Sequence, residues 1–126
     1  MRRVIVESPY AGATPEDIER NLRFLRCCMA DCFERGEAPY ASHALYTQPG
    51  VLDDKDPNER TLGIEAGFAW KDVAHATVVY TNLGISTGMS YGIEAAKKRD
   101  TLIEFRRLHD DWETDTSDLA TSRWGR

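Results

Sequence analysis

The stretch ATVVYTNLGISTGMSYGIEAAKK, residues 76–98, decides the fold. Its first part, 76–81, is rich in β-branched and aromatic residues and predicts a buried strand. Residues 83–88 then carry two glycines and two hydroxyl side chains, and apolar residues recur at helical spacing from Met89 onward. The stretch therefore predicts a strand, a tight turn and a helix in succession.

The turn between this strand and this helix has two interpretations. Its backbone N–H groups and the positive end of the helix dipole would bind a phosphate or a carboxylate at Ser86, Thr87, Gly88 and Met89. Alternatively, Ser86 or Thr87 is an ordinary N-cap of the helix, a position where hydroxyl residues are common. The local composition leaves both interpretations open.

Strands and helices alternate along the chain. The expected strands are residues 3–7, 38–42, 76–81 and 102–105. The expected helices run from the N-cap Thr14 to about Arg35, from about Asn58 to Val73, and from the turn at 83–88 onward. Short connections between such units favour a single-domain α/β fold, with a Rossmann-like (flavodoxin-like) parallel sheet and helices on both of its faces.

The first two helices carry specific packing predictions. Cys27, Cys28 and Cys32 fall in the first helix, and three cysteines without a signal peptide favour core packing over disulfides or a zinc site. The apolar positions of the second helix predict its buried face as Leu62, Ala66, Ala69, Trp70 and Val73.

Composition and charge limit the function classes. The chain has 126 residues, a formal net charge of −5 and a pI near 5.2, so we expect no basic face for duplex nucleic acid. No apolar run is long enough to span a membrane and no signal peptide opens the chain, so a cytoplasmic protein is expected. We place one domain at 1–108 and a polar tail or oligomerisation arm at 109–126, with Trp112 and Trp124 as isolated anchors.

Ligands of a doubly wound sheet bind at the carboxyl ends of its strands. This rule brings together the segments 8–12, 42–48 and 82–89 and the start of the second helix. Besides the turn at 86–89, the candidate binding residues there are Ser8, Tyr10, Gly12, His43, Tyr46, Arg60 and Asn82. Aromatic faces suit a base, and hydroxyls and amides suit a phosphate, which favours a nucleotide or a sugar phosphate. The alternative is that the histidine and the tyrosines are hydrogen-bonded packing residues.

Four motifs carry a resemblance to a known family. They are VIVESPYAG at 4–12, APYASHALYTQ at 38–48, LDDKDPNER at 52–60 and STGM at 86–89. With them the chain resembles the nucleoside 2-deoxyribosyltransferase-like family over about residues 3–106, and most closely its small phage and bacterial members of unassigned activity. The resemblance implies a homo-oligomer with sites near subunit contacts, in a bacterial cell or a phage-infected host. It also implies chemistry on the N-glycosidic bond of nucleosides or nucleotides. No cofactor and no metal are expected.

The resemblance also implies a carboxylate nucleophile, the Glu of a Ser-x-Gly-Met-x-x-Glu pattern, which attacks the anomeric carbon. Here that position is Gly92, and Glu94 lies about 200° further around the helix. The remaining acids near the predicted pocket are Glu7, Asp53, Asp54, Asp56, Glu59 and Glu65. Glu65 is the candidate to take the catalytic role or to bind a ribose hydroxyl, unless it is a helix-surface carboxylate. His43 is a second catalytic candidate.

Three functions therefore stay open. The first is an enzyme that hydrolyses or transfers at an N-glycosidic bond with a relocated carboxylate. The second is a nucleotide-binding protein without turnover, such as a phage protein that sequesters a nucleotide-derived signal. The third is a structural oligomer that kept only the fold. The intact turn at 86–89 argues against the third, and Gly92 favours the second over a standard transferase.

Overall fold

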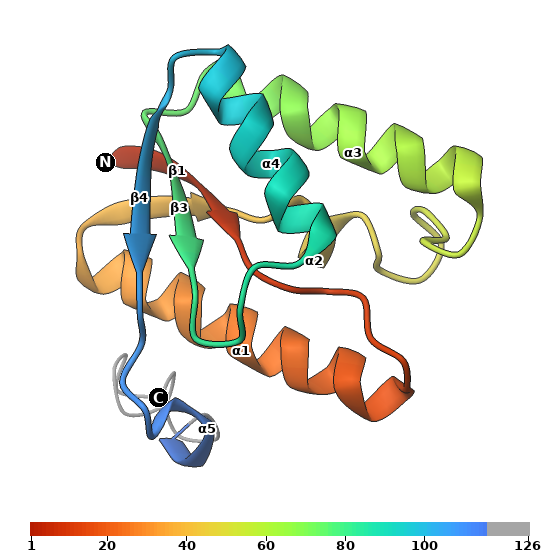
Figure 1. Cartoon of the computed structure of the whole chain (residues 1–126), viewed down its shortest axis with the longest axis horizontal. Coiled ribbons are helices and arrows are strands. Elements are labelled where there is room, and N and C mark those ends of the chain that lie inside the picture. The colour runs from red at the N-terminus through yellow and green to blue at the C-terminus, as the bar shows by residue number, and fades with distance from the viewer. Residues whose placement is uncertain (116–126) are drawn as a thin grey trace.

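The computed structural model describes residues 1–115 and shows a four-stranded, all-parallel sheet with helices on both faces (Figure 1). The strands are β1 (Arg2–Glu7), β2 (Glu37–Tyr40), β3 (Ala76–Tyr80) and β4 (Leu102–Arg106). The helices are α1 (Pro15–Glu34), α2 (Ser42–Leu45), α3 (Pro57–Lys71), α4 (Thr87–Lys98) and α5 (Trp112–Asp115). The strand order is β2-β1-β3-β4, so the predicted α/β class with a Rossmann-like parallel sheet is confirmed.

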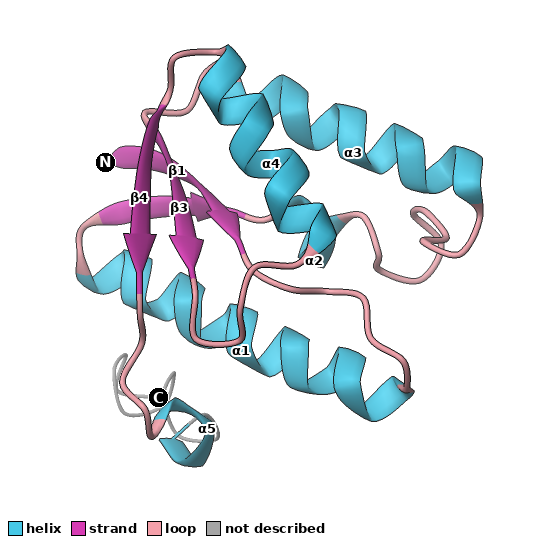
Figure 2. Ribbon diagram, viewed as in Figure 1, coloured by secondary structure: helices cyan, strands magenta, loops and turns pink. Residues whose placement is uncertain are grey.

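The two faces of the sheet carry different layers (Figure 2). One face packs against α1 and forms the larger core cluster, in which Val6, Val78 and Phe24 are at most 2 % exposed. On the other face α4 packs on the sheet, with Met89 in contact with Val79, and α3 lies beside α4. A cavity lies in this second layer, between α3, α4 and the end of β1.

The first helix begins as predicted. The Thr14 side chain accepts a hydrogen bond from the Asp17 N–H at 3.1 Å, which makes Thr14 the N-cap. Cys27, Cys28 and Cys32 are all buried in the core cluster, so their predicted packing role is confirmed. Burial raises the pKa of the Cys32 thiol to about 11, so this thiol is protonated at neutral pH.

The predicted core face of α3 is wrong. None of the five residues assigned to that face is fully buried: Leu62, Ala66, Ala69, Trp70 and Val73. The buried residues of the helix are instead Gly67 and Lys71. The inner side of α3 faces a cavity rather than an apolar core, and apolar periodicity therefore identified the outer side.

The segment around β2 differs from expectation in its details. The strand expected at 38–42 is Glu37–Tyr40, and it is followed by the short helix α2, which is not among the helices expected from the sequence. A helix of four residues is too short to show a 3.6-residue period in the sequence, so this turn of helix could not be predicted.

The polar segment after β4 is anchored on α1. Trp112 is 8 % exposed, and its ring packs edge-on against Phe24 with the ring centroids 4.9 Å apart. The Arg20 guanidinium lies 5.5 Å from the centroid of the same tryptophan ring. Trp112 therefore ties the end of the described chain to the core.

The rest of the predicted tail lies beyond this anchor. Residues 116–126, with Trp124, are outside the described residues, so a tail or oligomerisation arm at 109–126 stays a prediction. Within residues 1–115, no helix is both long and apolar enough to cross a membrane.

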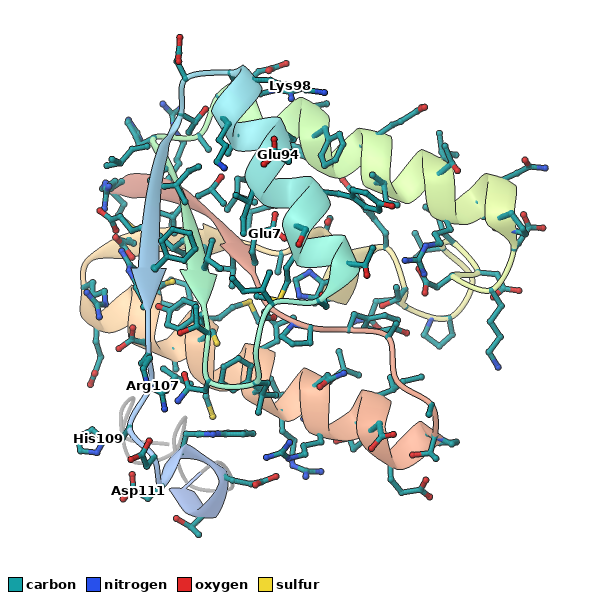
Figure 3. The ribbon with its side chains drawn as sticks, in the orientation of Figure 1. Glu7, Glu94, Lys98, Arg107, His109 and Asp111 are labelled. Carbon is teal, nitrogen blue, oxygen red and sulfur yellow. The ribbon has the colours of Figure 1, made fainter. Side chains whose placement is uncertain are left out.

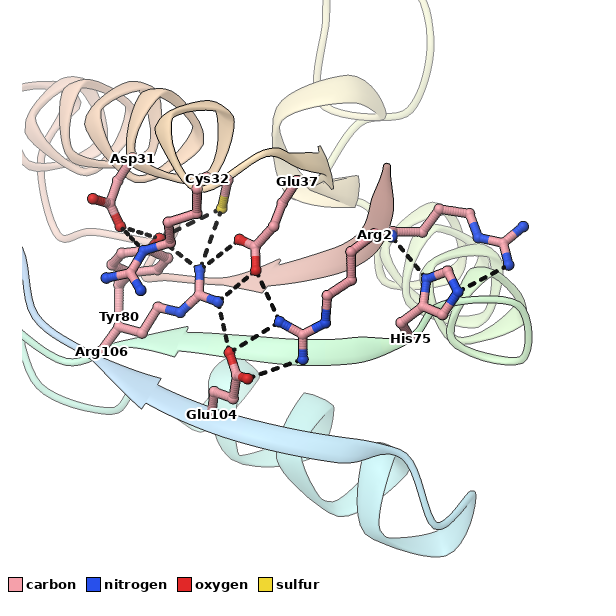
Figure 4. A network of polar contacts seen from close by, with 10 residues as sticks. Arg2, Asp31, Cys32, Glu37, His75, Tyr80, Glu104 and Arg106 are labelled. Atoms are coloured by element: carbon pink, nitrogen blue, oxygen red, sulfur yellow. Dashed lines mark hydrogen bonds and ion pairs between the residues drawn. The ribbon is translucent and has the colours of Figure 1, made fainter.

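A network of buried and half-buried charges lies on the α1 face of the sheet (Figure 4). Arg106 donates to the two carboxylate oxygens of Glu37 at 2.8 and 2.7 Å, and to Glu104 at 2.6 Å. Arg2 lies 2.9 Å from each of these carboxylates, and the hydroxyl of Tyr80 accepts a bond from Arg106 at 3.2 Å. The hydrogen bonds from the arginines lower the pKa of both glutamates. Every charge of this network has a partner.

Candidate functional site

A cavity of about 320 Å³ opens at the carboxyl end of β1, between α3 and the N-terminal half of α4. Its wall is built by the end of β1 and the loop after it, by α2, by the inner side of α3, and by the first turns of α4. The location is the one expected for ligands of a parallel α/β sheet. The volume lies at the lower end of the range of small-molecule sites.

Most of the residues predicted for the site meet at this cavity. Its wall includes eight of them: Ser8, Tyr10, His43, Arg60, Ser86, Thr87, Gly88 and Met89. They come from four segments that are far apart in the sequence but follow or face the ends of neighbouring strands. The strand-end rule therefore placed these residues together on physical grounds.

Four predicted residues do not line this cavity. Glu65 is exposed on α3, and Gly12 is exposed in the loop before α1. The Asn82 side chain is fully engaged with the backbone of Leu108, accepting from its N–H at 2.8 Å and donating to its carbonyl at 2.9 Å. Tyr46 lines a smaller adjoining cavity of about 80 Å³. The structure thus gives Asn82 an anchoring contact and brings no Glu65 carboxylate to the cavity.

The first turn of α4 confirms the N-cap interpretation of the turn, and anion binding there stays a prediction. Ser86 is the N-cap, because its hydroxyl accepts a hydrogen bond from the Met89 N–H at 3.2 Å. The N–H groups of Thr87 and Gly88 have no hydrogen-bond acceptor among residues 1–115, and both residues line the cavity. Two backbone donors and the positive end of the helix dipole are therefore available to an anion in the cavity.

Glu7 and Lys71 form a buried ion pair in the cavity wall. Lys71 Nζ lies 2.8 Å from Oε2 of Glu7 and 3.3 Å from Oγ1 of Thr77. The side chains of Lys71 and Glu7 are 2 % and 15 % exposed. Burial raises the pKa of the Glu7 carboxyl, and the ammonium of Lys71 acts in the opposite direction. The second oxygen of Glu7, Oε1, has no hydrogen-bond donor among the described residues.

Gly92 of α4 lies directly against this carboxylate. A Cβ atom at position 92 would overlap the Glu7 carboxylate where it now lies, so a side chain there would have to displace that carboxylate. Figure 3 labels Glu7 and Glu94 near α4, and of the two only Glu94 is largely exposed, in a pair with Lys97. The carboxylate of Glu7 thus fills the space that a side chain at position 92 would enter.

Ser8 and His43 form a second polar pair on the wall. The Ser8 hydroxyl lies 2.9 Å from His43 Nε2, and Ser8 is 5 % exposed. Burial lowers the pKa of His43 to about 4, so its imidazole is neutral at physiological pH. A neutral imidazole can hold the serine hydroxyl in place, but a pKa this low makes it a weak general base.

The mouth of the cavity carries a more exposed ion pair. Arg60 Nη1 lies 3.3 Å from Asp54 Oδ2, and the two side chains are 43 % and 30 % exposed. An exposed pair of this kind contributes little to stability, so Arg60 can exchange its partner for an anionic ligand. The mouth and the start of α4 together favour negative charge.

Tyr46 belongs to an aromatic cluster next to the cavity. The Tyr40 hydroxyl donates to the Tyr46 hydroxyl, and Trp70 Nε1 donates to Tyr46 at 3.2 Å. The rings of Tyr40 and Trp70 are stacked at a tilt, 5.2 Å apart. These contacts fit the packing alternative for this tyrosine.

Sequence reasoning missed the Glu7–Lys71 pair. Glu7 stands at the end of an apolar strand and is one of six acids near the predicted pocket. No feature of the sequence distinguishes it from the other five. Lys71 lies four residues after Gly67, so the two residues share one side of the helix. This side is neither apolar like a core face nor densely charged like a solvated face, and that could have been noticed in the sequence. Only the fold shows that both charges point to the same buried space.

Comparison with known proteins gives a family without an assigned activity. No curated protein matches the chain. A protein-family model described as a domain of unknown function (DUF7768) matches residues 2–106, which include all four strands of the sheet and the whole cavity wall. The chain therefore belongs to the DUF7768 domain family.

Proposed function

We propose that the cavity binds a nucleoside or nucleotide and that the protein acts on its N-glycosidic bond by hydrolysis or transfer. The observation that carries the proposal is the division of the cavity into two chemically different ends. The mouth offers Arg60 and the free N–H groups at the start of α4, and the inner wall holds a buried carboxylate.

This division suits a ligand with an anion at one end and a sugar at the other. Backbone donors and a guanidinium bind phosphate or another anionic group. A carboxylate at the inner wall accepts hydrogen bonds from sugar hydroxyls or reacts at the anomeric carbon. Tyr10 and Tyr91 also line the cavity and offer aromatic faces to a base. The resemblance of the four sequence motifs to the deoxyribosyltransferase-like family supports the same ligand class.

A panel of ribo- and deoxyribonucleosides, their 5′-monophosphates and cyclic nucleotides tests the proposal. The full chain is incubated with each compound, with and without a second base as acceptor, and the products are separated by chromatography. Release of free base indicates hydrolysis, and a new nucleoside indicates transfer. If no compound is cleaved, the proposed activity is wrong, and if none is retained either, the proposed ligand class is wrong as well.

A second candidate function is nucleotide binding without turnover. It is favoured by Gly92, because the position that the resemblance assigns to the nucleophile carries no side chain. This candidate predicts that a nucleotide raises the melting temperature and is recovered intact after long incubation. Sedimentation of the same samples with and without the ligand tests the homo-oligomer that the resemblance implies.

A further inference from the structure

We propose that Glu7 is the catalytic carboxylate of this cavity, presented from β1 into the space that Gly92 keeps clear. The inference rests on the proposed function, because it assigns the acid for cleavage of the N-glycosidic bond. The nucleophile that the resemblance implies would lie on helix α4, and the proposal places it on strand β1 instead.

The acids of the cavity wall leave one candidate for this role. Only Glu7 and Asp54 line the cavity among the described acidic residues. Asp54 is at the mouth, 30 % exposed and paired with Arg60. Glu7 is at the inner wall and 15 % exposed, where water is largely excluded and charge interactions are strong.

The two oxygens of Glu7 have different surroundings. Oε2 accepts from Lys71 at 2.8 Å, and Oε1 has no donor within residues 1–115. A buried carboxylate oxygen without a donor costs free energy, which a ligand contact would recover. Burial raises the pKa of Glu7, and the ammonium of Lys71, 2.8 Å away, opposes that rise by favouring the ionised carboxylate, which is the nucleophilic form.

The position of Gly92 gives a further reason. If the Glu7–Lys71 ion pair served only to attach α3 to the sheet, α4 would not need to leave space beside the Glu7 carboxylate. Instead, α4 has a glycine at a position where a side chain would displace the carboxylate. This arrangement keeps Glu7 at the border between β1, α4 and the cavity.

The proposed step is a double displacement with water as the only other reactant. Glu7 Oε1 forms a bond to the anomeric carbon C1′ while the C1′–N bond breaks, and its electron pair leaves with the base. The base takes a proton from water, which leaves hydroxide. A second water attacks C1′, the C1′–Oε1 bond breaks, and its electron pair returns to Glu7. The proton released by this water neutralises the hydroxide, so the net products are free base and pentose.

The experiment compares the full-length wild type with Glu7→Gln and with Glu94→Gln as a matched control on the exposed side of α4. The substrate is a compound of the panel above that the wild type cleaves. We expect Glu7→Gln to lower base release about 1,000-fold or more while nucleotide still raises its melting temperature. Glu94→Gln should cleave at the wild-type rate.

A second readout separates catalysis from structural support. Acid-quenched wild type is digested with trypsin, and the peptide of residues 4–20 should gain the mass of a pentosyl group, localised to Glu7 by fragmentation. Glu7→Gln should show no such adduct. A structural role of the ion pair would produce no adduct in either protein.

If Glu7→Gln fails to fold because Lys71 is left as a buried charge, Glu7→Gln/Lys71→Met removes both charges and takes its place. Base release at the wild-type rate in a folded Glu7 variant overturns the assignment and leaves the proposed function intact. A wild type that releases no base from any compound overturns the proposed function and the assignment together.

Discussion

Two buried groups of acids and cations, one on each face of the sheet, differ in how completely their oxygens are bonded. On the α1 face, Glu37 accepts from Arg106 with both oxygens and from Arg2 with one. On the α4 face, Glu7 accepts from Lys71 with one oxygen only. The pKa of Glu37 is lowered by its arginines, and the pKa of Glu7 is raised by burial.

The difference separates a structural use of buried charge from the functional use proposed for Glu7. A saturated network holds β2 and β4 together across the α1 face and presents no free acceptor to a ligand. An unsaturated pair beside a cavity keeps an acceptor free at the cost of stability. Buried charge alone therefore does not distinguish the two groups, and the proposal for Glu7 rests on its free oxygen beside a cavity.

The largest effect is expected on the saturated side. Arg106→Met leaves Glu37 buried with only Arg2 as a charged partner, and we expect a loss of about 3–5 kcal/mol of unfolding free energy. Urea unfolding measures it. The control is Arg107→Met, whose exposed pair with Asp110 should contribute less than about 1 kcal/mol. Equal small losses in both variants would mean that the network contributes no more than a surface pair.

The next effect concerns the mouth of the open cavity. Ser86→Asp retains an N-cap acceptor but places a negative charge beside the free N–H groups of Thr87 and Gly88. We expect weaker nucleotide binding by about 1.5–3 kcal/mol, about 10- to 150-fold in affinity. Thermal-shift titration measures it, with Ser86→Asn as the uncharged control. Unchanged affinity in Ser86→Asp would show that no anion binds at the start of α4.

A third variant tests the contact between α4 and β1. Gly92→Glu forces two carboxylates into one space, and overpacking of this kind costs about 1–3 kcal/mol before charge repulsion is added. Glu7→Ala should remove most of this loss when both changes are combined. The unfolding free energies of the two single variants and the double variant measure the coupling. Additive losses would mean that the two positions are not in contact.

The smallest effect is a difference in pH dependence. Glu37, with its lowered pKa, stabilises the fold above the ordinary value of 4.5, and this stability is lost as the pH falls through the folded-state pKa. Glu7 has the opposite sign, because its pKa is raised: its contribution is present below 4.5 and is lost as the pH rises through the folded-state pKa. Glu7→Gln should therefore gain stability relative to wild type with rising pH above 4.5. A flat difference across this range would contradict the raised pKa.

Most of the fold could be predicted from the sequence, because the local patterns of apolar and capping residues agree with the secondary structure that forms. The run at 76–98 is a strand, a turn and a helix in the structure, and Thr14 is the N-cap of α1. The face of α3 could not be predicted, because its inner side carries Gly67 and Lys71 and adjoins a cavity. Periodicity identifies the apolar side of a helix and says nothing about the shape of the space on the other side.

The candidate site was predicted in its outline and missed at its centre. Strand-end residues such as Ser8 and Arg60 line the cavity because parallel strands end at one edge. The role proposed for Glu7 depends on Lys71 and Gly92, which lie 64 and 85 residues after it in the chain. No local pattern connects them, so only the packed structure shows the contact.

The overlap of positions 7 and 92 also restricts the order in which mutations can accumulate. An acid can come from the strand or from the helix, but two acids at once compete for one volume. Moving the carboxylate from one position to the other by single substitutions must therefore pass through a chain with two crowded acids or with none. The first intermediate is destabilised and the second lacks the acid. The two positions are expected to change as a pair, as one inherited unit, even though they belong to different secondary-structure elements.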